Sequence, residues 1–214
     1  MASFDEIVIS YEWADGVTLW LGEDKAPFLR EEMTLPQNSL AVDRSYVNEI
    51  FTVGVAQGVG VVIEGGSLMD TPMTAHVMIS DGADSGDGAT SVNPSTQGAA
   101  AQTTADGTVL SDGNSSKLFD HDRSDFALTA RIDLKLAGSW DQMADYSAGE
   151  GEDAGTFVGV AVHWEVGETG DSAANNDFLA WTIDGSMESN GWGLSASYVE
   201  VDTDVESGLQ IGDI

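Results

Sequence analysis

The residues best able to do chemistry in this sequence are charged side chains gathered between residues 24 and 45. The stretch DKAPFLREE at residues 24–32 and the triplet DRS at 43–45 place basic residues beside acidic ones, in a chain that has 7 basic residues against 37 acidic ones. Opposed charges this close together either face water and create a local field or pair with one another and hold a loop in place. The six side chains concerned are Lys25, Arg30, Glu31, Glu32, Asp43 and Arg44.

Other constellations that could do chemistry are weak. The sequence contains no nucleophile elbow, no phosphate-cradling glycine loop and no catalytic triad. The three histidines are scattered over different elements, which argues against a metal centre. Asp81, Asp84 and Asp87 miss the spacing of a calcium-binding loop, so divalent-cation binding there is only an open alternative. We expect neither enzyme activity nor a cofactor or bound metal.

Composition excludes several classes of protein. A formal net charge of −30 repels nucleic acid and anionic membrane surfaces, whose recognition needs clustered lysine and arginine. The absence of cysteine excludes a disulfide framework. The sequence has no apolar run of about eighteen residues, the length that a membrane-spanning helix needs. Its N-terminus also lacks the pattern of a signal peptide, so we expect the chain to be either cytosolic or missing its start.

Alternation of apolar and polar residues predicts an all-β antiparallel fold of about eight strands. The clearest example is residues 126–136, where Leu128 and Ile132 alternate with Thr129 and Arg131. Asn190-Gly191 supplies the positive φ angles of a tight hairpin. The predicted strands cover residues 7–13, 17–21, 57–65, 73–80, 126–136, 156–166, 178–188 and 192–202.

The connections between these strands are mostly short on one side and long on the other, as in an outer-membrane barrel. The polar loop at 81–124 is acceptable on a barrel rim, whereas the connection at 138–155 breaks the pattern. The later strands have the length of about nine to eleven residues that a tilted strand needs to cross a bilayer. Alternation by itself also fits a water-soluble β-sandwich, so the residues alone leave both architectures open.

The segment GEDKAPFLREEMTLPQNSLAVDRSYVNEIF, followed by AQGVGVVIEG, resembles the phosphate-selective porin family of the O and P type. Its family elements are a strand ending in a glycine, a K-x-P-F-x-x-E element, a D-R-S triplet and a G-V strand. FALTARIDLKLAGSWDQ, GTFVGVAVHWE and DGSMESNGWGLSASYVE are similar to later strands of the family. The similarity covers most of the chain apart from the loop at 81–124.

This resemblance implies a transmembrane β-barrel of about sixteen strands in the bacterial outer membrane, embedded in its lipid and usually homotrimeric. Residues 1–214 would then form part of a single barrel domain, an interior fragment of a longer chain. Residues 25–50 would be the connection that enters the lumen. Lys25, Arg30, Glu31, Glu32, Asp43 and Arg44 would form the pore constriction or, about equally well, a salt-bridge cluster that anchors the loop.

The side chains expected to line the lumen lean acidic, which argues against phosphate selectivity because that selectivity needs several converging cations. We therefore expect passive diffusion of small hydrophilic solutes or ions, with a weak preference for cations. The alternatives are a secreted acidic β-sandwich that binds carbohydrate or calcium, and a closed eight-stranded barrel that acts as a surface protein. The expected lumen-lining residues are Glu12, Arg131, Asp133, Lys135, His163, Glu165, Asp184 and Glu188.

Overall fold

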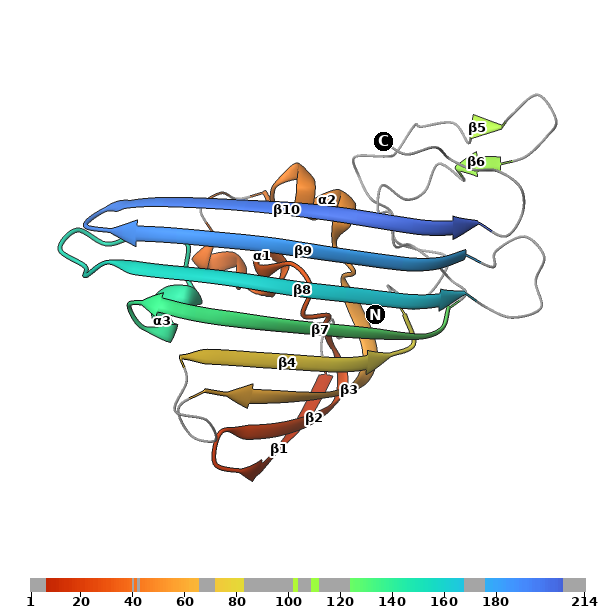
Figure 1. Cartoon of the computed structure of the whole chain (residues 1–214), viewed down its shortest axis with the longest axis horizontal. Helices are drawn as coiled ribbons and strands as arrows, with labels where there is room; N and C mark the ends of the chain where they lie inside the picture. Colours follow the sequence, from red (N-terminus) through yellow and green to blue (C-terminus); the bar gives the residue numbers. More distant parts are fainter. Residues whose placement is uncertain are drawn as a thin grey trace, which may run out of the picture.

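A computed structural model describes residues 7–39, 41, 43–65, 72–82, 102–103, 109–111, 124–167 and 176–205 of the chain. Its main element is one eight-stranded antiparallel sheet, which confirms the predicted all-β class and all eight predicted strands (Figure 1). The strands lie in the sheet in the order β1 (Ile7–Ala14), β2 (Val17–Lys25), β3 (Val55–Glu64), β4 (Met73–Ser80), β7 (Ser124–Ala137), β8 (Gly155–Gly167), β9 (Asn176–Ser189) and β10 (Trp192–Val205).

The sheet is open. Each strand of the sheet pairs with the strands beside it in this order, and among the described residues β1 and β10 form edges with no further partner. Two further short strands, β5 (Gln102–Thr103) and β6 (Val109–Ser111), pair only with each other. Strands β7, β9 and β10 have 14 residues each and β8 has 13, so all four exceed the five or six residues typical of soluble proteins.

The hairpin between β9 and β10 has the turn that its sequence predicts. Asn190 and Gly191 adopt φ angles of 45° and 85°, a region that Asn and Gly tolerate better than other residues. The side-chain Oδ1 of Asn190 accepts a hydrogen bond of 2.9 Å from the backbone N–H of Gly151. The turn is thereby tied to the connection that links β7 to β8.

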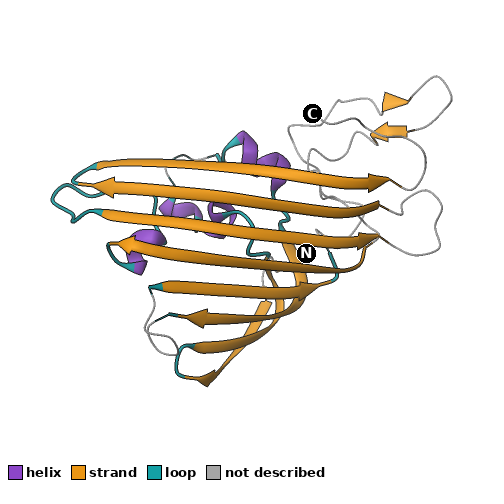
Figure 2. Cartoon of the chain, viewed as in Figure 1, coloured by secondary structure: helices purple, strands orange, loops and turns teal. Residues whose placement is uncertain are grey.

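Helices are few and short (Figure 2). They are α1 (Arg30–Met33), the 3₁₀ turn η1 (Pro36–Asn38), α2 (Tyr46–Phe51) and α3 (Trp140–Met143). Ser45 caps α2, and a capping box formed by Ser139 and Gln142 opens α3. No helix in the part of the chain that the structure describes is long and apolar enough to cross a membrane.

One face of the sheet is covered by the connection between β2 and β3. We call residues 26–53 the inner segment and the face beneath it the inner face; α1 and α2 belong to this segment and lie behind the sheet in Figure 1. The core of the molecule lies between the two. It consists of Ala26, Phe28, Leu29 and Val53 from the segment with Ala56, Met78, Ala161 and Ala180 from the sheet.

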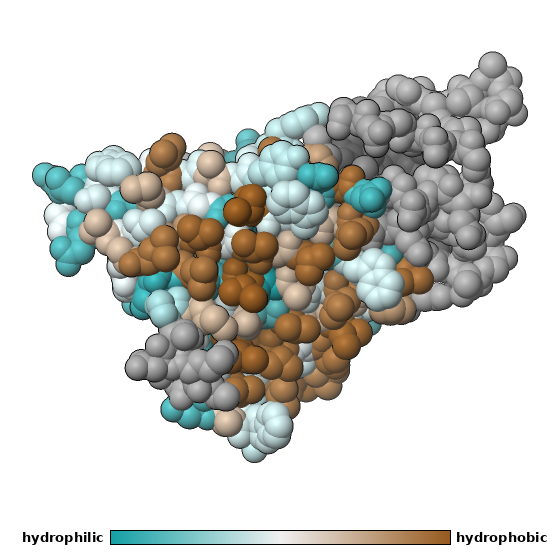
Figure 3. All heavy atoms as spheres, in the orientation of Figure 1, coloured by the Kyte–Doolittle hydropathy of each residue, from teal (hydrophilic) through white to brown (hydrophobic). Residues whose placement is uncertain are grey.

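The opposite face, the outer face, is apolar and exposed. Figure 3 shows hydrophobic residues gathered over the middle of the strands on this face. The register places them in rows across neighbouring strands, such as Leu134 beside Val158 and Ile132 beside Val160. Exposed side chains of the outer face include Ile9, Tyr11, Trp13, Leu21, Val59, Ile79, Ile132, Leu134, Leu136, Val160, Trp164, Leu179, Trp181, Ile183, Met187, Trp192, Leu194 and Tyr198.

Candidate functional site

Arg30 links the inner segment to the sheet. Its Nε and Nη2 donate to the carbonyl oxygen of Met143 at 3.2 and 2.6 Å, and its Nη1 donates to the hydroxyl of Ser186 on β9. The guanidinium also lies over the rings of Tyr146 and Phe157, 4.6 and 5.6 Å from their centroids. Arg30 is buried, so the contacts of this predicted constriction residue are made within the protein.

Glu31, Glu32 and Arg44 also pair inside the segment. The backbone N–H and the hydroxyl of Ser45 both donate to the Glu31 carboxylate. Glu32 accepts hydrogen bonds from Arg44 and, at 2.8 Å, from the amide of Asn48. Burial alone would raise the pKa of Glu32, but these two hydrogen bonds and the positive charges of Arg44 and Lys25 outweigh it and hold the pKa below its ordinary value.

The remaining two predicted constriction residues lie at different places. Lys25 is half-buried at the end of β2, and its backbone N–H donates to Oδ1 of Asp24 at 2.8 Å. Asp43 is exposed and lines a groove described below. Of the six residues, four therefore hold the segment together or to the sheet, as in the anchoring interpretation of the sequence.

On the inner face, Arg131 forms the most connected polar cluster. Its Nε donates to both carboxylate oxygens of Asp133 at 3.0 Å, and its Nη2 donates to Asp133 at 2.7 Å and to Asp184 at 2.9 Å. Its Nη1 donates to the carbonyl oxygen of Phe28 at 3.0 Å. Two buried residues on β7 and the half-buried Asp184 on β9 thus meet beneath the inner segment.

His163 and Glu165 form a second buried cluster on β8. The Nδ1 of His163 lies 2.8 Å from the hydroxyl oxygen of Thr129, and its Nε2 lies 3.0 Å from the Glu165 carboxylate. The ring of Phe28 packs against the imidazole with a centroid separation of 6.1 Å. Like Arg131 and Asp133, these two predicted lumen-lining residues lie under the segment and do not face water.

The other predicted lumen-lining residues lie toward the margins of the inner face. Lys135 is half-buried, with its ammonium 4.9 Å from the ring centroid of Trp140. Glu188 is buried near the β9–β10 turn, and Glu12 is exposed on the edge strand β1. Asp184, already paired with Arg131, also lines a groove between the inner segment and the sheet.

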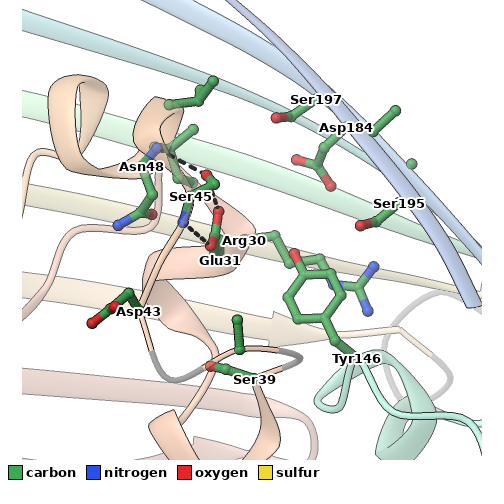
Figure 4. Close-up of a pocket in the computed structure, with 15 residues that line it drawn as sticks. Arg30, Glu31, Ser39, Asp43, Ser45, Asn48, Tyr146, Asp184, Ser195 and Ser197 are labelled. Carbon is green, nitrogen blue, oxygen red and sulfur yellow. Dashed lines mark hydrogen bonds between the residues drawn. The ribbon is translucent and has the colours of Figure 1, made fainter.

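This groove has a volume of about 370 Å³ and lies between the inner segment and strands β9 and β10 (Figure 4). Its charged lining is Arg30 against Glu31, Asp43 and Asp184. Burial is the main cause that raises the pKa of the neighbouring Tyr146 to about 12, so this hydroxyl stays protonated. The polar lining is completed by Ser39, Ser45, Asn48, Ser195 and Ser197.

Several contributors to this arrangement were not among the residues predicted from the sequence. Tyr146 belongs to the connection at 138–155, whose unexpected length was the only signal that it has a role. The main-chain carbonyl of Phe28 carries no side-chain signal at all. Gly159 occupies an inward position of an alternating strand, where a residue without a side chain marks a close approach by another group.

Comparisons of the chain with protein-family models, with curated proteins and with solved structures gave no match. The family resemblance therefore stays a prediction from the motifs. Among the residues that the structure describes, no group of three or more His, Cys, Asp or Glu side chains could hold a metal ion. Of the three aspartates at 81, 84 and 87, Asp81 accepts a hydrogen bond from the backbone N–H of Gln57, while the other two and most of the loop at 81–124 lie outside the described residues.

Proposed function

We propose that this protein forms part of the wall of an outer-membrane porin, through which small hydrophilic solutes or ions diffuse passively. The observation that carries the proposal is the inverted polarity of the sheet. Charged side chains such as Arg131 and Asp133 are paired and buried on the inner face, and large apolar side chains are exposed on the outer face. A sheet that faced water would pay to expose such a large apolar patch, whereas hydrocarbon is the solvent that suits it.

Strand length and the position of the tryptophans support the same proposal. Strands of 13 and 14 residues are long enough to cross a bilayer at a tilt. Trp13, Trp164, Trp181 and Trp192 are exposed on the outer face, where aromatic belts lie in membrane proteins. The competing β-sandwich would need a second sheet packed on this face, and in the described part of the chain the only other sheet is the short β5–β6 pair.

The inner segment argues for a barrel wider than eight strands. An eight-stranded barrel encloses only enough space for its own side chains. The inner face of this sheet instead carries a folded segment, residues 26–53, with two helices and a 3₁₀ turn. Closure therefore requires further strands beside β1 and β10. The barrel of about sixteen strands implied by the family motifs meets this requirement. It remains part of the proposal, as does the trimer that the same motifs imply.

The charges beside the groove favour cations as the permeating ions. Phosphate selectivity needs several cationic donors that converge on the anion. Among the described residues that line the groove, Arg30 is the one cation, and its donors already bind Met143 and Ser186, whereas three carboxylates lie around it. We expect Asp43, the exposed carboxylate among them, to make the largest contribution to cation preference.

The lipid-facing position of the outer face can be tested without a conducting pore. Variants with a single remaining tryptophan, either Trp181 on the outer face or Trp20 on the inner face, are inserted into vesicles that contain brominated lipid. Bromine in the acyl chains should strongly quench Trp181 and leave Trp20 nearly unchanged. Equal quenching of both residues, or a protein that stays in solution without detergent, would contradict the membrane proposal.

Conductance tests the pore itself. The protein in a planar bilayer under a salt gradient should give discrete steps with a reversal potential that favours cations. Asp43→Asn should reduce this preference, while Asp15→Asn in the exposed β1–β2 turn should not change it. Anion preference would overturn the assignment of the acidic groove as the selectivity region.

A further inference from the structure

Arg131 binds three parts of the molecule at once. Its guanidinium joins Asp133 on the same strand, Asp184 on β9 and the main-chain carbonyl of Phe28 in the inner segment. The side chain has no exposed surface, so these bonds are not in competition with water. The planar guanidinium has five N–H donors and can donate to three acceptors in different directions. A lysine ammonium on its flexible stem would bind the same acceptors less well.

The sheet is shaped to receive this guanidinium. Asp133, Gly159 and Asp184 stand in one row across β7, β8 and β9, because Gly159 pairs with both aspartates in register. The guanidinium lies over the glycine between the two carboxylates. A Cβ at position 159 would collide with Nη2 of Arg131 and come within 2.7 Å of the Asp133 carboxylate, so an alanine there would force the guanidinium out of its place between the two carboxylates.

We propose that Arg131, seated over Gly159, is the positioning residue that fixes the inner segment against the sheet. It thereby sets the width of the groove between the segment and strands β9 and β10, which is the passage for solutes in the proposed pore. This inference rests on the proposed function as a pore. Arg131 reaches from the sheet to the segment through Phe28, and Arg30 reaches from the segment back to Ser186 on the sheet. The two arginines form opposed anchors, so the segment is a fixed constriction and not a mobile gate.

Asp184 connects the anchor with the groove. The same carboxylate that binds Arg131 also lines the groove between the segment and strands β9 and β10. Loss of the anchor should therefore have two effects at once. The segment should move away from the sheet, which widens the passage, and Asp184 should lose its paired cation, which makes the passage more negative.

The absence of cysteine from the chain allows a direct test. Val53→Cys places one thiol in the segment at a site that is 1% exposed, and its alkylation rate in detergent reports how often the segment leaves the sheet. Gly159→Ala in this background should raise the rate about tenfold or more, since exchange of a buried group follows its local opening. Arg131→Lys, which keeps the charge and loses the fork, should do the same.

Gly185→Ala is the matched control, because a Cβ there meets only the carbonyl oxygen of Phe157 at the ordinary distance of 3.5 Å. We expect it to leave the alkylation rate within about twofold of the parent and the unfolding midpoint in urea close to the parent's. Equal rates for Gly159→Ala and Gly185→Ala, with Arg131→Lys also unchanged, would overturn the anchor.

Conductance separates this inference from the function on which it rests. If the parent conducts, Gly159→Ala should give larger and more variable steps with a stronger preference for cations, and Gly185→Ala should not. Parent-like steps in Gly159→Ala would overturn the claim that Arg131 sets the width. If the parent does not conduct but the alkylation rates differ as expected, the anchor stands and the pore proposal fails.

Discussion

The two faces of the eight-stranded sheet differ in the side chains that they bury and expose. On β7, Asp133 on the inner face is 2% exposed, whereas the next residue, Leu134 on the outer face, is 40% exposed. On β8, the inward-facing His163 is buried and its neighbour Trp164 is half exposed. In a water-soluble antiparallel sheet the apolar face is the one that packs. The difference indicates that the two faces of this protein are adapted to different surroundings.

The comparison also explains why the buried charges beneath the inner segment are paired. A buried charge without a partner costs several kcal/mol, and this cost sets a strict requirement for partners beneath the inner segment. Arg131, Asp133 and Asp184 meet the requirement together, and Glu32 meets it with Arg44 and Asn48. The outer face needs no such pairing, since its side chains carry few polar groups. Substitutions on the two faces should therefore change the free energy of unfolding by different amounts, and only those on the outer face should depend on the lipid.

The largest effect should come from the core between the inner segment and the sheet. Phe28→Ala removes a fully buried ring and should lower the free energy of unfolding by about 3–5 kcal/mol. Phe126→Ala on the outer face is the control, because that ring is 39% exposed and leaves no enclosed cavity when it is removed. Urea titrations followed by tryptophan fluorescence in vesicles would measure both. A cost for Phe126→Ala as large as that for Phe28→Ala would contradict the assignment of the faces.

A charge placed in the middle of the outer face should have the next largest effect. Val160 is half exposed near the middle of β8, and Val160→Arg should cost about 2–4 kcal/mol if hydrocarbon surrounds it. Leu194→Arg lies on the same face near the start of β10, beside the turn, where the expected cost is only about 0–1 kcal/mol.

The same pair of variants distinguishes lipid from water. If water covers the outer face, Val160→Arg should leave stability nearly unchanged and improve solubility, because it would replace an exposed apolar side chain. Unfolding in vesicles, measured for both variants beside the parent, decides between these outcomes.

A smaller effect should appear as a dependence on pH in the inner segment. The pKa of Glu32 lies below its ordinary value of 4.5 in the folded protein, so its carboxylate stabilises the fold fully above about pH 4.5 and less as the pH falls through the folded pKa. Glu32→Gln should cost about 1–3 kcal/mol at neutral pH, the usual range for hydrogen bonds to a charged group.

This difference between parent and Glu32→Gln should shrink in acid, where the parent's carboxylate is also neutral. Unfolding of both proteins at a series of pH values would measure it. A difference that stays constant from neutral to acid pH would show that the carboxylate charge is not what holds Arg44 and Asn48.

The strands could be predicted because the apolar residues recur with the period of a pleated sheet. Leu128, Ile132 and Leu134 share one face of β7, and Thr129 and Arg131 share the other, as the alternation requires. The turn at Asn190-Gly191 could also be predicted, because few residues other than Asn and Gly tolerate a positive φ angle. These signals are local, and each depends on residues that lie close together in the chain.

The site was less predictable because it depends on contacts between distant parts of the chain. Alternation places Arg131 on the inner side, but only the path of the inner segment, 103 residues earlier in the chain, determines that it is buried and bound to Phe28. The charges of the segment were recognised, yet a sequence does not tell whether Arg30 faces water or a carbonyl oxygen. The role of Gly159 likewise follows from its neighbours in β7 and β9 and not from its own strand.

The smallest effect should come from the β9–β10 turn, which lies beyond both faces. Asn190→Ala removes the hydrogen bond from Gly151 and places an alanine at a φ of 45°, which together should cost about 1 kcal/mol. Asn190→Gly loses only the hydrogen bond and should cost less. Because this turn lies outside the apolar region, the cost should be the same in vesicles of short-chain and long-chain lipid, while that of Val160→Arg should change with the lipid. Suppose instead that bilayer thickness changed the cost of Asn190→Ala as much as that of Val160→Arg. A residue at the end of the strands would then be as deep in the lipid as one at their centre. The apolar outer face could therefore not be the boundary with hydrocarbon.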